Sequence, residues 1–161
     1  MERLWSPWRA KYIASGVDSN SSVCVFCEIG KDNQNDEQNL VVFRGEFNFV
    51  VLNLFPYISG HLLVVPYEHL SELDNSPKAV TDELMDLTKR SQTALRNVYE
   101  PAGYNVGMNL GAAAGAGIVD HIHAHILPRW TGDTNFMTTV SETRVLPEDL
   151  QTTYTKLRDR F

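Results

Sequence analysis

The stretch Asp120–Trp130 reads DHIHAHILPRW and places three of the chain's five histidines at alternate positions. Side chains two residues apart share one face of a β-strand, so His121, His123 and His125 are expected to line one side, with about 7 Å between successive positions. The residues that alternate with them are apolar and are expected to form the buried face. The pattern therefore predicts a strand over residues 121–127 with one chemically active side.

Three interpretations of this polar side are open from the window alone. The first is a solvent-exposed strand face, although three histidines among five in one short window are hard to attribute to chance. The second is a metal site, since His-x-His on a strand is a common zinc arrangement. The third is catalysis, in which a neutral imidazole attacks phosphorus and forms a covalent intermediate, while its neighbours fix the tautomer and supply protons.

The segment before the histidines favours the third interpretation. Residues 109–121 read NLGAAAGAGIVDH, a run of glycines and small side chains. Such a run lets backbone N–H groups approach a phosphate closely. It is not a Walker loop, because no Gly-Lys-Ser/Thr follows it. A glycine-rich loop that leads into a triple-histidine strand indicates phosphate chemistry more strongly than either feature alone.

Composition narrows the class of protein. The chain has 161 residues and a formal net charge of -6, which fits a single domain over residues 1–161 and argues against a broad basic surface for a nucleic-acid polymer. No apolar run approaches the ~18 residues of a membrane span, and the basic start lacks the apolar core of a secretory signal. Two cysteines in such a chain are expected to be thiols or metal ligands. We therefore expect a cytoplasmic enzyme or binding protein with no membrane partner.

Periodicity predicts an α+β fold with a mainly antiparallel sheet. Strand-type segments cover residues 40–44, 47–53, 62–65, 104–109 and 121–127, and Gly45–Glu46 is expected to turn a hairpin between the first two. A long helix is expected to open at Ser76–Pro77 and a last one at Pro147, with Glu148 and Asp149 in its first turn. Their expected buried stripes are Leu84, Leu87, Ser91, Leu95 and Val98, and Leu150, Tyr154, Leu157 and Phe161. Residues 16–22 and 30–39 read as polar loops.

The sequence resembles the histidine triad (HIT) family. HIHAHIL at 121–127 matches the family motif His-φ-His-φ-His-φ-φ, where φ is apolar, and GHLLVVP at 60–66 and CVFCEIG at 24–30 resemble two further family segments. The resemblance runs from about Cys24 to Trp130. It implies a HIT-like fold of about five strands with one long and one C-terminal helix, flanked by an extension at 1–23 and by a tail and helix at 131–161. It also implies a homodimer joined edge to edge.

The resemblance assigns a role to each matching residue. It makes His123 the nucleophile on the α-phosphorus, with His121 and His125 beside it and His125 on the phosphate oxygens. His61 would support the nucleophile, or be a buried structural histidine. The phosphate charge would be stabilised by Asn109 and by the backbone of Gly115, Ala116 and Gly117. Asn53 would bind ribose, and the base would lie among Phe26, Ile29, Val51 and Leu54, four residues that could equally be plain core.

Two further segments resemble the bacterial diadenosine tetraphosphate phosphorylases within this family. They are WSPWR at 5–9 and PRWTGDTNFM at 128–137. The resemblance implies a nucleotide substrate, inorganic phosphate as co-substrate, no organic cofactor, and release of ATP and ADP through an adenylyl-His123 intermediate. Trp130 would shape the polyphosphate end of the pocket, or be a packed aromatic side chain.

One pair of loop residues departs from both branches of the family. Hydrolases of the family commonly carry Gln at the position of Gly117, and the phosphorylases are expected to carry Gly-Ser at the pair Ala116–Gly117. The absence of Gln is consistent with phosphate as the acceptor, whereas the absence of the Ser hydroxyl removes a possible ligand for the incoming phosphate. A hydrolase of dinucleoside polyphosphates or nucleoside phosphoramidates is the runner-up. A third hypothesis is a nucleotide-binding adaptor with little activity, and a fourth is a metal-binding protein that uses all three triad histidines.

Cys24 and Cys27 form a single C-x-x-C, which is half of a tetrahedral zinc site. Some bacterial triad proteins complete such a site with two histidines, and the matching positions here are His69 and His121. That structural zinc would use both cysteines and pin the N-terminal segment to the catalytic strand. The alternative is a pair of partly buried thiols beside a surface His69. A thioredoxin-type redox pair is disfavoured, because no strand-to-helix context is expected at this C-x-x-C.

Overall fold

The sheet has five strands in the order β1-β2-β3-β5-β4, and every neighbouring pair is antiparallel. The computed structural model describes residues 23–134 and 146–161, so the WSPWR segment and most of the predicted N-terminal extension lie outside the described residues. The strands are β1 (Val41–Arg44), β2 (Asn48–Leu52), β3 (Leu62–Pro66), β4 (Gly103–Met108) and β5 (Ala124–Arg129). The predicted α+β architecture is confirmed.

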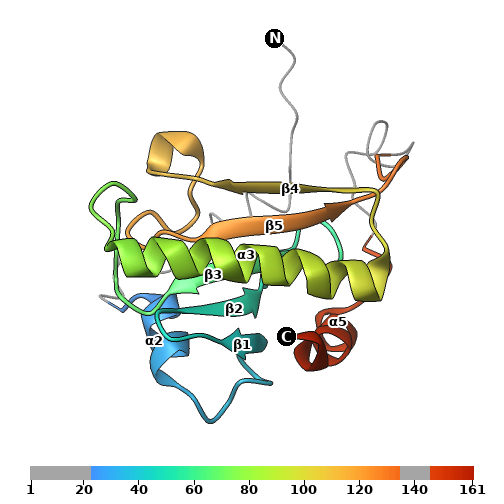
Figure 1. The fold of residues 1–161 in the computed structure, drawn as a ribbon, viewed down its shortest axis with the longest axis horizontal. Helices are drawn as coiled ribbons and strands as arrows, with labels where there is room; N and C mark the ends of the chain where they lie inside the picture. Colours follow the sequence, from blue (N-terminus) through green and yellow to red (C-terminus); the bar gives the residue numbers. More distant parts are fainter. Residues whose placement is uncertain (1–22, 135–145) are drawn as a thin grey trace.

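Three α-helices and two short 3-10 turns accompany the sheet in the described part of the chain. They are α2 (Val25–Lys31), α3 (Lys78–Tyr99), α5 (Leu150–Leu157), η1 (Ala112–Ala114) and η2 (Arg158–Arg160). The long α3 runs across one face of the sheet, and α5 lies next to β1 and to α3 (Figure 1). Within the described residues, no helix combines the length and apolar character that a membrane crossing requires.

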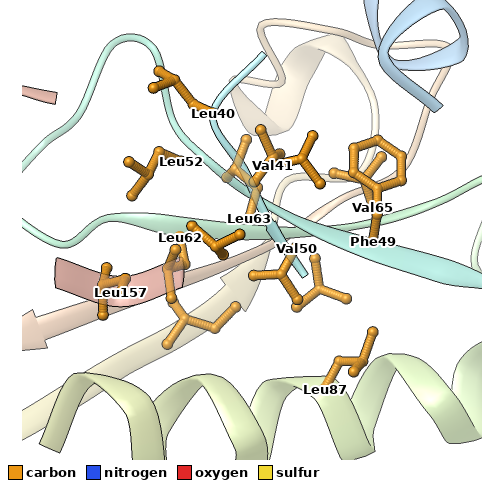
Figure 2. Close-up of a cluster of buried hydrophobic side chains, with 14 of the residues drawn as sticks. Leu40, Val41, Phe49, Val50, Leu52, Leu62, Leu63, Val65, Leu87 and Leu157 are labelled. Carbon is orange, nitrogen blue, oxygen red and sulfur yellow. The ribbon is translucent and has the colours of Figure 1, made fainter. Parts of the chain in front are cut away.

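The core lies between the sheet and α3, where apolar side chains of β2 and β3 meet the helix. Figure 2 shows Leu87 of α3 directed toward Val50 and Leu62 on the sheet, with Leu157 of α5 at the side. The predicted helix stripes are confirmed in the main, since Leu84, Leu87, Ser91, Leu95, Tyr154 and Leu157 are buried and Val98, Leu150 and Phe161 pack partly buried against the core. Burial of each large side chain of this kind stabilises the fold by about 1.5–3 kcal/mol.

The β1–β2 hairpin is fastened to α3 by one carboxylate. Glu83 accepts backbone N–H groups of Glu46, Phe47 and Asn48, each at 2.7 Å, and the Asn48 side-chain amide at 2.9 Å. These bonds hold the pKa of the Glu83 carboxyl below its usual value against the opposing effect of burial. The hairpin turn at Gly45–Glu46 therefore depends on the long helix as well as on its own sequence.

Both predicted helix starts are displaced. Helix α3 begins at Lys78 with Pro77 as its N-cap, and α5 begins at Leu150 rather than at Pro147. Asp149 is the N-cap of α5, because its side chain accepts the Thr152 N–H at 2.9 Å. An acidic residue expected in the first turn thus satisfies a free N–H from just outside the helix.

The predicted strand over 121–127 is also wrong at its start, since β5 begins at Ala124. The β3–β5 ladder stops at the pair Val64↔Ala124, and two residues later β3 reaches Pro66, which has no N–H to donate. The Ile122 N–H instead bonds the Leu70 carbonyl at 2.7 Å. Of the three triad histidines, only His125 lies within the strand.

Candidate active site

A cavity of about 760 Å³ opens beside the triad. Its wall combines α2, the turn before β1, the end of β2 with the residues that follow, and the glycine-rich loop. Among the residues that line it are Phe26, Ile29, Asn39, Val51, Asn53, Leu54, Asn109, Gly115, Ala116, Gly117, His123 and His125. The structure thus brings the expected phosphate, ribose and base contacts of the sequence analysis around one cavity.

A hydrogen-bonded relay fixes the tautomer of His125. The Tyr57 backbone N–H donates to His61 Nδ1 at 3.2 Å, so the proton of the buried His61 ring is on Nε2. That Nε2–H donates to His125 Nδ1 at 2.9 Å. The proton of His125 is then on Nε2, a buried atom with no hydrogen-bond partner among the described residues. His125 therefore offers a donor to the cavity that it lines.

His123 is set in the opposite tautomer. Its Nδ1–H donates to the His121 carbonyl at 2.9 Å, which leaves an unprotonated Nε2. Burial lowers the pKa of His123 below 6.5, so the ring is neutral at pH 7. Burial, with the neighbouring rings, lowers the pKa of His61 to about 3 and that of His125 to about 4. The site thus pairs an imidazole lone pair on His123 with an imidazole donor on His125.

The glycine-rich loop turns tightly where the sequence has glycine. Gly111 and Gly115 have φ angles of 80° and 84° on either side of η1, a region that residues with a Cβ rarely occupy. The Ala114 and Gly115 N–H groups bond back to Gly111 and Ala112 within this turn. Asn109 and residues 115–117 line the same cavity as His123, as a phosphate-binding loop requires.

All four expected base contacts line the cavity, and they differ in how far they are buried. Phe26 and Val51 are buried and Ile29 is half-buried, whereas Leu54 is 62% exposed at the cavity wall.

Trp130 is not among the residues that line the cavity. Its indole N–H donates to the Tyr99 carbonyl at 3.2 Å and its ring packs edge-on against Tyr99, so the structure does not bring Trp130 to the cavity and places it as a packed aromatic.

Sequence reasoning missed two features of this wall. The first is the helical conformation of α2, the segment that carries the expected contacts Phe26 and Ile29, where the guanidinium of Arg44 binds carbonyl groups at the C-terminal end. The second is the turn at 36–40. The sequence predicts a solvated loop over residues 30–39, but this turn brings Gln38, Asn39 and Leu40 to the cavity. The turn ends at Leu40, which has a left-handed φ of 58°. A Leu residue rarely adopts this conformation, so the sequence does not predict it.

The four predicted metal ligands converge at the N-terminal end of α2. His121 Nδ1 lies 3.3 Å from Cys24 Sγ and 3.6 Å from Cys27 Sγ, and His69 Nδ1 lies 3.2 Å from Cys27 Sγ. All four ligand atoms fall within 4.8 Å of one another. Ligands bound at about 2.0–2.3 Å around a tetrahedral zinc lie about 3.5 Å apart. The spacing and the Cys₂His₂ chemistry therefore fit zinc, and His123 and His125 are outside this group.

The orientation of His121 agrees with a role as a ligand. Its Nε2–H donates to the Pro66 carbonyl at 2.9 Å, so the lone pair is on Nδ1, the atom that faces the two sulfurs. The same residue orients His123, because its carbonyl accepts the His123 Nδ1–H. Between the two cysteines, Phe26 contacts both rings, with centroid distances of 5.5 Å to His121 and 5.1 Å to His123.

Comparison with known proteins agrees with this geometry. Residues 34–132 match the family model of the HIT domain. The chain belongs to the HIT family. The AP-4-A phosphorylase of Mycobacterium tuberculosis is 43% identical over 159 residues, which cover 95% of this chain and 80% of that relative. The asymmetrical bis(5'-nucleosyl)-tetraphosphatase of Schizosaccharomyces pombe is 33% identical over 94 residues, or 58% of this chain and 50% of that relative.

A solved structure of the same family has the same fold. A zinc-bound histidine triad family protein from Mycobacterium smegmatis superimposes with a TM-score of 0.69 at 29% identity, over 85% of this chain and 91% of the other. Together, the relatives support an enzyme role for this HIT-family chain in dinucleotide processing.

Proposed function

We propose that the chain cleaves diadenosine tetraphosphate by phosphorolysis, giving ATP and ADP. The observation that carries the proposal is the opposite tautomers of two neighbouring cavity histidines, a lone pair on His123 and a donor on His125. Such a pair suits attack on a phosphoryl group whose oxygens need a hydrogen-bond donor. The similarity to a relative named AP-4-A phosphorylase supports the choice of substrate and acceptor.

In the first step, His123 Nε2 attacks the α-phosphorus of one adenylyl group. The bond from that phosphorus to the bridging oxygen breaks, ATP leaves, and the protein holds an adenylyl-His123. Attack makes the imidazole cationic, and the His121 carbonyl that accepts its Nδ1–H stabilises that charge. His125 Nε2–H donates to a non-bridging phosphate oxygen, and His61 keeps it in the donor tautomer.

In the second step, inorganic phosphate attacks the adenylyl phosphorus and the P–N bond to His123 breaks. ADP forms and His123 returns to its neutral state. We propose that Asn109 and the part of the glycine-rich loop at Gly115, Ala116 and Gly117 bind the phosphate oxygens through both steps, since they line the cavity beside His123. Asn53 then contacts ribose, and the apolar wall around Phe26 holds the base.

Product analysis with and without inorganic phosphate tests the proposal. Diadenosine tetraphosphate is incubated with the protein in each buffer and the nucleotides are separated by chromatography. We expect continued turnover to ATP and ADP only when phosphate is present. When phosphate is absent, we expect an adenylylated protein by intact mass, no ADP, and release of no more than one ATP per chain. A His123→Ala variant should give neither. Turnover that continues in this variant would show that another group is the nucleophile.

Hydrolysis is the second candidate, and the loop sequence favours it in one respect. Ala116–Gly117 lacks the hydroxyl expected as a ligand for the incoming phosphate, and one relative is named as an asymmetrical tetraphosphatase. AMP and ATP in equal amounts, at a rate independent of phosphate, would identify water as the acceptor. Nucleotide binding without turnover in either buffer would indicate an adaptor.

We further propose that Cys24, Cys27, His69 and His121 bind a structural zinc. The ligand spacing supports this assignment, and so does the likeness to a zinc-bound relative. Bound zinc would tie α2 to the segment that carries the nucleophile. Zinc measured by atomic emission should be near one per chain and should be lost in Cys27→Ser, whereas zinc that persists in this variant would refute the site.

We propose that the chain forms a homodimer through β4. We also propose that it acts in the cytoplasm. β4 is an edge strand of the sheet, and Val106 at its centre is 47% exposed. An edge strand of the described sheet that carries an exposed apolar side chain suits pairing with a second copy. Light scattering should give twice the chain mass, and Val106→Lys should give a monomer.

A further inference from the structure

The polar residues around the cavity fall into two groups, and the proposed function uses only one of them. Asn109, His123 and His125 lie at the phosphate end, and Asn53 faces His61 beside them. Gln38 and Asn39 come from the turn before β1, next to the apolar residues proposed to hold the base. A nucleobase carries a polar edge as well as two faces, and an apolar wall cannot distinguish one such edge from another.

The amide of Asn39 is held in one orientation. Its Nδ2 donates to Asp32 Oδ2 at 3.0 Å. The same carboxylate accepts the Asn35 amide at 2.9 Å and the Gln34 backbone N–H at 3.3 Å. These hydrogen bonds, that from Asn35 first, lower the pKa of the Asp32 carboxyl, so at pH 7 it accepts and does not donate. Only the NH₂ end of Asn39 can face Asp32, which leaves its Oδ1 for the cavity side.

The backbone also directs this residue to the cavity. The Asn39 N–H bonds the Asn35 carbonyl at 2.9 Å, and the turn ends at Leu40 with its left-handed φ of 58°. A Leu in this conformation is strained. The Leu40 side chain is buried in the core (Figure 2), and Leu40 also lines the cavity. The turn therefore presents residues 39 and 40 together to the same space.

We propose that Asn39 determines base specificity, with its Oδ1 accepting a hydrogen bond from the 6-amino group of adenine. This inference rests on the proposed function, because it requires the nucleotide base to lie at the α2 end of the cavity. Hypoxanthine and guanine carry a carbonyl oxygen at position 6, which would face Asn39 Oδ1 without a proton between the two acceptors. Asp32 is then a positioning residue that prevents the amide from turning its NH₂ end to those bases.

The test compares binding of AMP and IMP by calorimetry, with no turnover needed. We expect wild-type protein to bind AMP at least about tenfold more tightly than IMP, since the mismatched base leaves a polar group unpaired. Asn39→Ala should bring the ratio of the two Kd values close to one. Gln34→Ala is the matched control, because the exposed Gln34 contacts Asp32 through its backbone N–H, which the substitution keeps, and does not line the cavity, and it should keep the wild-type ratio.

The remaining outcomes of this test contradict either the role of Asn39 or the nucleotide pocket. An AMP preference that survives in Asn39→Ala, or no preference in the wild type, refutes the role of Asn39 and leaves the proposed function standing. Absence of binding by both nucleotides refutes the nucleotide pocket itself. Should Asn39→Ala not fold, the wild type is titrated with N6,N6-dimethyl-AMP, which has no donor at position 6, and binding as tight as that of AMP refutes the hydrogen bond.

Discussion

Replacing His61 by Phe tests the histidine relay, because Phe keeps a ring of similar size and removes both nitrogens. The lost bond is the 2.9 Å contact from His61 Nε2–H to His125 Nδ1, between two buried rings. Leaving one buried acceptor unpaired costs about 1–3 kcal/mol. His125 can regain a partner for Nδ1 only by leaving the donor tautomer or turning its ring. At about 1.4 kcal/mol per factor of ten, adenylylation should slow by about 10- to 100-fold.

The assay is the single-turnover rate of adenylyl transfer, measured by rapid quench in four proteins. His125→Phe should slow this step by about 10²–10³, the usual cost of losing one donor to a developing charge. In the double variant, His61→Phe should add less than about threefold, because residues that act through one another are not additive. A full multiplicative loss in the double variant would show that His61 acts independently of His125, and the relay would be wrong.

Three further predictions concern stability. Glu83→Gln should lower the free energy of unfolding by about 2–4 kcal/mol in urea titrations, because charge-assisted bonds to the hairpin backbone are lost, whereas Asp82→Asn, beside it and exposed, should change it by less than about 0.5 kcal/mol. Stability should fall between pH 6.5 and about 4, by up to about 1.4 kcal/mol per pH unit for each of His61 and His125. Their folded pKa values are about 3 and about 4, so the unfolded chain binds more protons in this window; a flat profile would contradict this. Removing zinc with a chelator should lower the melting temperature of the wild type, by the equivalent of about 2.7 kcal/mol for zinc at 100 times its Kd, and should leave that of Cys27→Ser unchanged.

The sequence was informative where a pattern is local. The alternation in HIHAHIL predicts which side chains share a face, and the hairpin around Gly45–Glu46 and the stripe on α3 follow from periods of two and 3.6 residues. The family resemblance supplied the cavity residues, since sites of this kind combine segments that local patterns treat separately. His61 illustrates this, because its importance depends on the pairing of β3 with β5.

The missed features depend on distant partners. VFCEIGK has only seven residues, with two β-branched side chains and a glycine, and is too short to be predicted as a helix. Helix α2 forms where Arg44 binds carbonyls at its end and His121 contacts its N-cap residue, Cys24. The polar residues of the turn at 36–40 predict a solvated loop, although Asp32 accepts the side-chain amides of Asn39 in this turn and of Asn35 just before it. Neither contact leaves a periodic signal in the sequence.

His121 links the proposed zinc site to His123, the proposed nucleophile, through two different atoms. Its ring faces the cysteines through Nδ1, and its backbone carbonyl accepts the His123 proton. A displacement of the ring by lost metal would therefore move the group that keeps the His123 lone pair on Nε2. Phe26 adds a second link, because it lies between the cysteines in α2 and packs against both rings. The proposed zinc and the proposed nucleophile are thus linked through a single residue, and loss of zinc is expected to lower the rate of adenylylation before it unfolds the chain.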